Sequence, residues 1–187
     1  MPSLKDLIFK ASALLFIATA GGCLVSDEPM LDARTGKAAP LADADYVGCP
    51  SDESEDECAT FTVTRGADGL YTFQKDDEEP AKFRFRRVAR GAYAAQSEEG
   101  GGYSYYYGKG DAQTFTLVLM QCDALPGALR ARLIKRGDFE TDDDDFDVCT
   151  VKTMAGLVAA TKAYANGVDL ADHAAIVMTR VEEAAAQ

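Results

Sequence analysis

Alternation of apolar and polar side chains over residues 59–121 is the feature that most constrains how this chain can fold. Phe61 and Val63 alternate with threonines. Phe83 and Phe85 alternate in the same way with lysine and arginine. A period of two predicts strands that bury one face and leave the other in contact with water. The connectors are short and rich in glycine and acidic residues, so consecutive strands are expected to pair as antiparallel neighbours.

The chain after this region extends the prediction. Residues 128–136 carry Leu129, Ala131 and Leu133 at alternate positions between two glycine-containing turn signals, so we expect a further strand there rather than a helix. Segment 174–181 stays open between strand and helix. Together these patterns predict an α+β protein, mainly β, whose roughly seven or eight strands form an antiparallel meander or a small curled barrel.

A change of period predicts one C-terminal helix, over residues 152–166. Met154, Leu157 and Val158 follow helical spacing, and a threonine before them is a candidate N-cap. Asn166-Gly167 is typical of a helix end, because glycine adopts the left-handed conformation without strain. We expect this helix to cover an open face or an end of the barrel.

The amino terminus has the layout of a secretory signal peptide, over residues 1–22. Lys5 and Lys10 precede an apolar run, which is followed by small residues. The apolar run is shorter than the roughly 20 residues that a transmembrane helix needs. Ala18-Thr19-Ala20 also fits the rule for cleavage into a soluble secreted or periplasmic protein, and this alternative stays open.

Ala20-Gly21-Gly22-Cys23 resembles the lipobox of bacterial lipoprotein precursors. The resemblance implies that Cys23 is lipidated, with acyl chains such as palmitate, and becomes the first residue of the mature protein. It further implies attachment to a membrane of the cell envelope through this acyl anchor. With Leu24 after the cysteine, the resemblance implies the outer membrane, with the protein facing the periplasm.

The cysteine count agrees with lipidation. The chain has five cysteines, and an acylated Cys23 leaves four that can form disulfides in an oxidising compartment. Four cysteines allow three connectivities. The most local one pairs Cys49 with Cys58 and Cys122 with Cys149, and we favour it, although chain order leaves the other two open.

Residues 23–45 differ in composition from the remainder of the chain. They contain two prolines, few large apolar residues and no clear period, which predicts a flexible tether behind the lipid anchor. Residues 46–187 then form a single disulfide-linked β-rich domain, long enough to bury a core of its own.

The chain is strongly acidic, with 19 lysines and arginines against 31 aspartates and glutamates and a formal net charge of −12. Such a surface repels phosphate backbones, so nucleic acid is not an expected partner. It attracts cations and basic proteins, which makes a basic protein partner the natural alternative to simple solubility.

Two groups of side chains are candidates for a binding surface. Tyr103, Tyr105 and Tyr107 share one face of a strand that follows three glycines, and amphipathic aromatic side chains are common in recognition surfaces. Arg84 and Arg86 belong to the main basic cluster. The tyrosines can equally fill one face of a barrel, and the arginines can pair with the chain's own acids.

Catalytic and metal motifs are weak. Asp143, Asp145 and Asp147 match the first acidic positions of an EF-hand, but Val148 occupies its glycine position and Met154 the position of its bidentate glutamate. The single histidine, and serines outside any nucleophile motif, do not favour an enzyme. No cofactor is predicted.

These features are most typical of a non-enzymatic binding or interaction protein on the periplasmic face of the cell envelope. The alternative is a small barrel that binds an apolar or anionic small ligand, with the tyrosine and arginine strands at its mouth.

Overall fold

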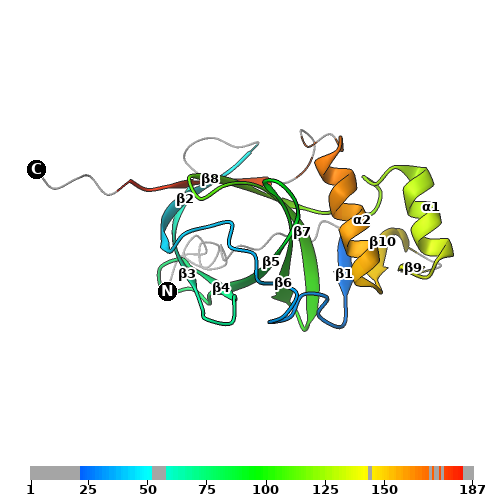
Figure 1. Ribbon diagram of the computed structural model, residues 1–187, viewed down its shortest axis with the longest axis horizontal. Helices are drawn as coiled ribbons and strands as arrows, with labels where there is room; N and C mark the ends of the chain where they lie inside the picture. The colour runs from blue at the N-terminus through cyan, green and yellow to red at the C-terminus, as the bar shows by residue number, and fades with distance from the viewer. Residues whose placement is uncertain are drawn as a thin grey trace, which may run out of the picture.

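The computed structural model describes residues 22–51, 58–142, 145–168, 170, 173 and 175–182. Its main body is a closed antiparallel barrel of eight strands (Figure 1). The barrel strands are β2 (Ala44–Pro50), β3 (Ala59–Arg65), β4 (Tyr71–Gln74), β5 (Ala81–Ala89), β6 (Ala92–Glu99), β7 (Gly102–Gly110), β8 (Thr114–Leu119) and β11 (Ala175–Arg180). Each strand pairs with the next, and β11 joins β8 to β2 and closes the ring. The predicted mainly-β class and the small barrel are confirmed.

Short turns create this meander. Between β6 and β7, Gly100 and Gly101 both have positive φ, 61° and 87°, and so allow the chain to reverse within two residues. The ladder beyond this turn runs without interruption from Glu99 opposite Gly102 to Ala92 opposite Lys109.

A second layer lies on one side of the barrel. It consists of β1 (Leu24–Ser26), α1 (Gly127–Lys135), β9 (Phe139–Asp142), β10 (Asp145–Val151) and α2 (Met154–Ala165). β1 pairs with the start of β7 and runs parallel to β10, which links the barrel sheet to β9. α2 packs on the outer face of β5, β6 and β7, and Figure 1 shows it between the barrel and α1.

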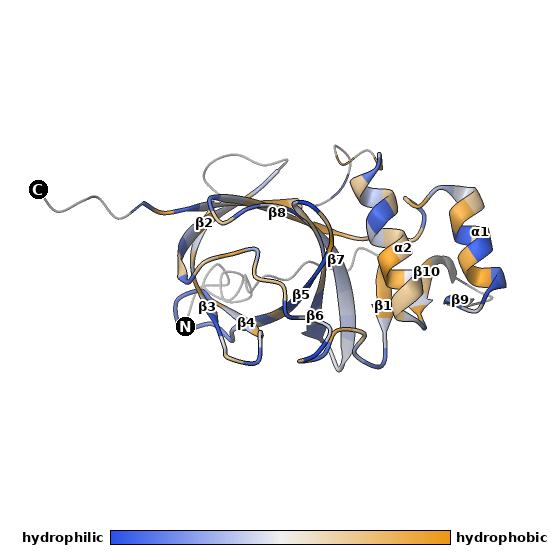
Figure 2. Cartoon of the chain, in the orientation of Figure 1, coloured by the Kyte–Doolittle hydropathy of each residue, from blue (hydrophilic) through white to orange (hydrophobic). Residues whose placement is uncertain are grey.

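The predicted C-terminal helix is confirmed as α2. The hydroxyl oxygen of Thr153 accepts a hydrogen bond from the amide of Gly156 at 3.0 Å, which makes Thr153 the N-cap. Asn166 ends the helix, and Gly167 follows with a φ of 137°. Figure 2 shows apolar residues along much of α2.

The two layers enclose two hydrophobic cores. The inner core fills part of the barrel lumen with aromatic side chains, among them Tyr46, Tyr71, Phe85, Tyr93 and Phe115. The outer core lies between the barrel wall and the second layer, and includes Leu24, Tyr105, Tyr107, Leu133, Phe139 and Leu157. β6 and β7 contribute to both cores, because their two faces are covered.

The predicted flexible tether over residues 23–45 is wrong. Three of its large apolar residues, Leu24, Leu31 and Leu41, are buried, and Met30 packs against the outer core. The backbone amide of Leu31 donates to the side-chain oxygen of Gln96 at 2.7 Å, and the side-chain nitrogen of Gln96 donates back to the Leu31 carbonyl at 3.1 Å. These contacts are with residues far along the chain, so the composition of the segment gave no indication of them.

The strand predicted over residues 128–136 is also wrong, because this segment forms α1. Leu129 and Leu133 lie four residues apart and turn to the same side of a helix, whereas Ala131 is exposed. The carbonyl of Pro126 accepts from the amides of Leu129 and Arg130, and these bonds begin the helix. The protein therefore has two helices within the described residues, where one was predicted.

Segment 174–181 contains strand β11, in agreement with its β-branched residues. The predicted signal peptide falls on residues 1–22, of which residues 1–21 lie outside the described part of the chain. Among the described residues no helix has both the length and the apolar composition needed to cross a membrane.

The packing of residues 27–43 predicts a clear mutational effect. Leu31→Ala should lower the free energy of unfolding by about 2–5 kcal/mol, because it leaves a cavity between the segment and β6. Arg34→Ala, at an exposed position of the same segment, should change it by less than about 0.5 kcal/mol. Urea denaturation followed by circular dichroism measures both. Equal, negligible effects would mean that the segment is not packed as the structure shows.

Candidate functional site

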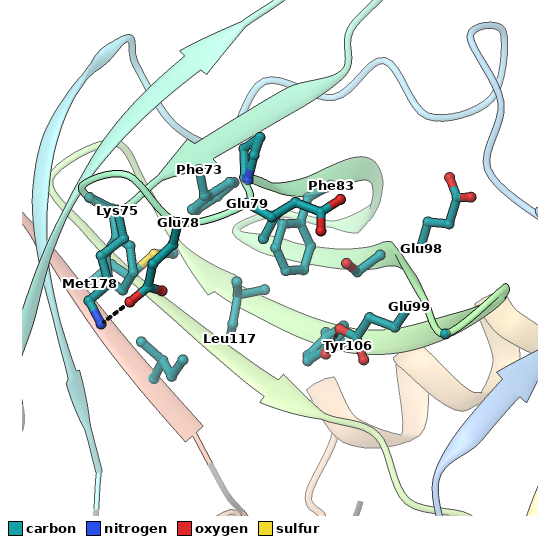
Figure 3. A pocket seen from close by; sticks show the side chains of 16 residues that line it. Phe73, Lys75, Glu78, Glu79, Phe83, Glu98, Glu99, Tyr106, Leu117 and Met178 are labelled. Atoms are coloured by element: carbon teal, nitrogen blue, oxygen red, sulfur yellow. Dashed lines mark hydrogen bonds and ion pairs between the residues drawn. The ribbon is translucent and has the colours of Figure 1, made fainter. Parts of the chain in front are cut away.

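A cavity of about 390 Å3 opens at one end of the barrel (Figure 3). Its volume lies near the lower end of the roughly 300–1,000 Å3 typical of small-molecule sites. Apolar side chains from five strands form its wall, namely Phe61, Phe73, Phe83, Leu117, Ile176 and Met178. The cavity is therefore suited to the apolar body of a small molecule.

The rim of the cavity comes from two turns at the same end of the barrel. The β4–β5 turn supplies Lys75, Glu78 and Glu79, and the end of β6 supplies Glu98 and Glu99. Figure 3 shows Lys75 and Glu78 on one side of the opening and Glu98 and Glu99 on the other, with Phe83 and Leu117 between them and Glu79 beside Phe83. An acidic rim thus surrounds an apolar interior.

The opposite end of the barrel is covered by the chain before β2. Figure 1 shows this segment running across the barrel opening. The hydroxyl of Tyr71, inside the barrel, donates to the carbonyl of Leu41 at 2.9 Å, and the amide of Ala38 donates to the carbonyl of Phe85 at 2.9 Å. These bonds hold the segment against the barrel, so the cavity opens toward the acidic end.

Aromatic rings separate the cavity from this covered end. The rings of Tyr71 and Phe85 meet edge to face at 5.2 Å, and Phe85 meets Phe115 at 5.7 Å. Nearer the opening, Phe83 contacts Phe73 at 5.0 Å and Tyr106 at 5.5 Å, again edge to face. Such contacts favour one fixed arrangement of rings, so the wall of the cavity is preformed.

Glu99 and Tyr106 form the polar contact between rim and interior. The hydroxyl of Tyr106 donates to Oε1 of Glu99 at 2.7 Å. Burial, together with the negative charge of Glu99, raises the pKa of Tyr106 well above its usual value, so the phenol keeps its proton. The Ser104 hydroxyl lies 3.4 Å from the second carboxylate oxygen. The carboxylate is thereby held at the edge of the apolar interior.

The position of Tyr106 depends on how β7 pairs with its neighbours. One edge of β7 pairs with β6, and the other edge is shared between β8 and β1. Residues 106–110 pair with β8 and close the barrel, whereas Tyr103 and Ser104 pair with β1. The strand thus leaves the barrel cylinder where the cavity begins and continues into the sheet of the second layer. Tyr106 is therefore the last barrel position of β7 before the opening, where its hydroxyl reaches Glu99 at the rim.

On the other side of the opening, Nζ of Lys75 lies 3.1 Å from Oε1 of Glu78. Among the described residues that line the cavity, Lys75 is the one basic side chain. Its charge is balanced by Glu78, which leaves the carboxylates of Glu79, Glu98 and Glu99 to set the sign of the potential at the opening.

The tyrosines predicted to stand at the barrel mouth lie on the other side of the wall. Tyr103, Tyr105 and Tyr107 do share a face, but it is the outer one. Tyr105 and Tyr107 are buried beneath the second layer, and the Tyr105 hydroxyl lies 2.6 Å from that of Ser26. Their neighbour Tyr106 points into the barrel instead.

The basic strand does not reach the cavity either. Arg84 pairs with Asp68 in the β3–β4 turn, with nitrogen and oxygen 2.6 Å apart, at the covered end of the barrel. Arg86 donates to the backbone carbonyl of Thr35 at 3.4 Å. The arginines thus contact the chain itself, and the structure does not bring them together with the tyrosines at the opening.

The sequence carried a signal for the correct tyrosine. Residues 105–107 are three consecutive aromatic residues, so both faces of that strand carry aromatic rings, and the run 92–97 on β6 contains no charged residue. Lack of alternation indicates a strand that is covered on both faces. The identity of the inward face then depends on the partner strands, and a single strand cannot reveal it.

The disulfide predictions are confirmed. Cys49 pairs with Cys58 and Cys122 with Cys149, with Cα atoms 4.2 Å and 5.6 Å apart. Disulfides of this kind indicate an extracytoplasmic protein. Cys23 is a free, half-buried cysteine directly before β1, and its carbonyl accepts from the amide of Cys149.

The weak metal candidates cannot be placed. Asp143 and the side chains of Asp145 and Asp147 lie outside the described residues. Across the described ranges, no group of three or more histidine, cysteine, aspartate or glutamate side chains is arranged to hold a metal ion. The Nδ1 of His173 lies 2.8 Å from the side-chain oxygen of Gln121, on the outer side of the barrel beside Tyr164.

Comparison with protein-family models, with curated proteins and with solved structures finds no match for this chain.

The Glu99–Tyr106 contact predicts a pH-dependent effect of Tyr106→Phe. Because the folded pKa of Tyr106 is raised, its contribution to stability is complete below pH 10 and is lost as the pH rises further. The variant should be less stable than the parent protein by about 0.5–1.5 kcal/mol at pH 8, from the lost hydrogen bond.

This difference in the free energy of unfolding should shrink between about pH 10 and 11. In that range the phenol of Tyr106 ionises in the unfolded parent protein but not in the folded one, so the parent loses stability, whereas the variant has no phenol to ionise. Urea denaturation at several pH values measures it. Tyr103→Phe, on the half-buried outer face, is the matched control. A difference that stays constant with pH would contradict the role given to Tyr106.

Proposed function

We propose that this protein is a non-enzymatic binding protein whose barrel holds one small, largely apolar molecule. The observation that carries the proposal is the cavity of about 390 Å3, open at one end and lined by aromatic and aliphatic side chains. A filled lumen would leave a barrel with purely structural or surface roles. Here Tyr71, Phe85 and Phe115 pack together toward the covered end, and the cavity lies between these rings and the opening.

The arrangement of the wall supports binding rather than catalysis. The cavity-lining groups that can exchange protons are carboxylates at the rim, together with Tyr106 and Lys75, each of which already has a partner in Glu99 and Glu78. A site of this kind orients and shields a ligand. Apolar burial provides the affinity, at about 25 cal/mol per Å2 of apolar surface removed from water.

The uncharged fluorophore N-phenyl-1-naphthylamine tests this function. The parent protein should bind it saturably, with a rise in its fluorescence. Leu117→Trp fills the cavity and should weaken the affinity about tenfold or more, whereas Thr64→Trp, at an exposed position of β3, should leave it unchanged.

Ile176→Trp narrows the opening from a half-buried position and replaces Leu117→Trp should that variant fail to fold. Thermal unfolding followed by circular dichroism establishes folding of each variant. Absence of saturable binding to the parent protein, or equal binding to all variants, would overturn the proposal.

The proposed place of action is the cell envelope, with the protein anchored through acyl chains on Cys23. Two disulfides support an oxidising compartment, and the lipobox-like Ala20-Gly21-Gly22-Cys23 supports lipidation. β1 begins at Leu24, directly after this cysteine. An anchor at Cys23 would therefore hold the barrel close to the membrane surface, on the periplasmic side, without an intervening tether. A basic protein partner remains compatible with the acidic surface.

Expression of the full chain in a Gram-negative host tests the anchor. The protein should partition into the detergent phase, and its intact mass should correspond to a chain that begins at Cys23 with acyl groups attached. Cys23→Ser should abolish both properties. A soluble product that begins at Gly21, with unchanged partitioning of the variant, would favour the secreted alternative and contradict lipidation.

A further inference from the structure

The charges around the cavity narrow the class of molecule that fits it. We infer that the ligand is a hydrophobic monocation, with an amine or quaternary ammonium group at the rim and an alkyl or aromatic body inside the barrel. This inference rests on the proposed binding function and adds the chemistry of the ligand.

The first argument is the charge of the rim. Four carboxylates line the opening, from Glu78, Glu79, Glu98 and Glu99, and the one basic group among the described lining residues is that of Lys75. Lys75 is paired with Glu78 at 3.1 Å. A net negative opening above a low-dielectric interior concentrates cations and repels anions, and the net charge of −12 on the chain adds to the effect.

The second argument is the fixed position of Glu99. Its Oε1 accepts from the Tyr106 hydroxyl at 2.7 Å, and Tyr106 is part of the cavity wall. A carboxylate has about four acceptor sites, so this bond leaves room for a charged N–H donor. The carboxylate therefore lies where the polar end of an amphipathic ligand must stop, at the boundary between apolar wall and water.

The third argument is the wall itself. Phe73, Phe83 and Tyr106 form a cluster of rings. The centroid of the Phe83 ring lies 5.0 Å from that of Phe73 and 5.5 Å from that of Tyr106. Aromatic rings attract cations to their electron-rich faces, and this attraction adds to the burial of apolar surface. The same wall stabilises the cationic group and the apolar body of one ligand.

The arginines of the basic strand do not support an anionic ligand. Arg84 is held by Asp68 at the covered end of the barrel, and Arg86 donates to the Thr35 carbonyl. Neither lines the cavity. An anion in the cavity would face the carboxylates of the rim with Lys75 as its one described basic neighbour, and Lys75 already has Glu78 as its partner.

Three probes of equal chain length separate charge from apolar burial: octylammonium, octanol and octanoate. The affinity of each probe is measured by its ability to displace N-phenyl-1-naphthylamine from the full protein in low-salt buffer at pH 7. Octylammonium should bind about tenfold more tightly than octanol, and octanoate should bind more weakly than octanol. The preference for octylammonium should fall as salt is raised.

A pair of matched variants tests the role of Glu99. Glu99→Gln keeps an oxygen that can accept from Tyr106 or from a ligand hydroxyl but removes the charge, so it should weaken octylammonium about five- to tenfold and octanol by no more than about twofold. Asp77→Asn removes one charge from the β4–β5 turn at an exposed residue outside the cavity lining, and should change neither by more than about twofold.

The outcomes separate this inference from the function on which it rests. Equal binding of the three probes, or tightest binding of octanoate, would overturn the cationic ligand while the barrel remained a binding protein. An unchanged affinity of Glu99→Gln for octylammonium would also overturn it. Failure of all three probes and of N-phenyl-1-naphthylamine to bind would instead overturn the binding function.

Discussion

The wall formed by β6 and β7 is buried on both of its faces, and both hydrophobic cores depend on it. Its inner face turns Tyr93, Ala95 and Tyr106 to the lumen, and its outer face turns residues such as Tyr105 and Tyr107 to the second layer. Removing a strand from this wall would expose both cores at once. The barrel and the α2 layer are therefore expected to unfold together, as one cooperative unit.

Features that depend on neighbours in the chain could be predicted from the sequence. The hairpins follow from period-two alternation and short turns, and α2 follows from the Thr153 cap and the Asn166-Gly167 end. The disulfide pairing follows from the choice of the most local connectivity. In each case the interaction that decides the structure lies within a few tens of residues.

Features that depend on distant partners could not be predicted. Leu31 is fixed by Gln96, 65 residues away, so residues 23–45 looked like a tether in isolation. Residues 128–136 satisfied the alternation of a strand, but Leu129 and Leu133 also satisfied a helix. Which of the adjacent tyrosines faced the cavity was decided by β8 and α2. The acidic rim was missed because its residues come from two turns that only barrel closure brings to the same opening.

The existence of the cavity depends on a glycine in the wall as much as on the side chains that line it. A Cβ atom at Gly48 would lie 2.6 Å from a ring carbon of Phe61, a distance that real Cβ atoms do not tolerate. The ring of Phe61 therefore lies against the backbone of β2 rather than across the lumen. The same arrangement occurs between Gly108 and Phe115 deeper in the barrel. Space in the lumen is thus built into β2 and β3 by the absence of a single methyl group, at a position where alternation predicts a large inward side chain.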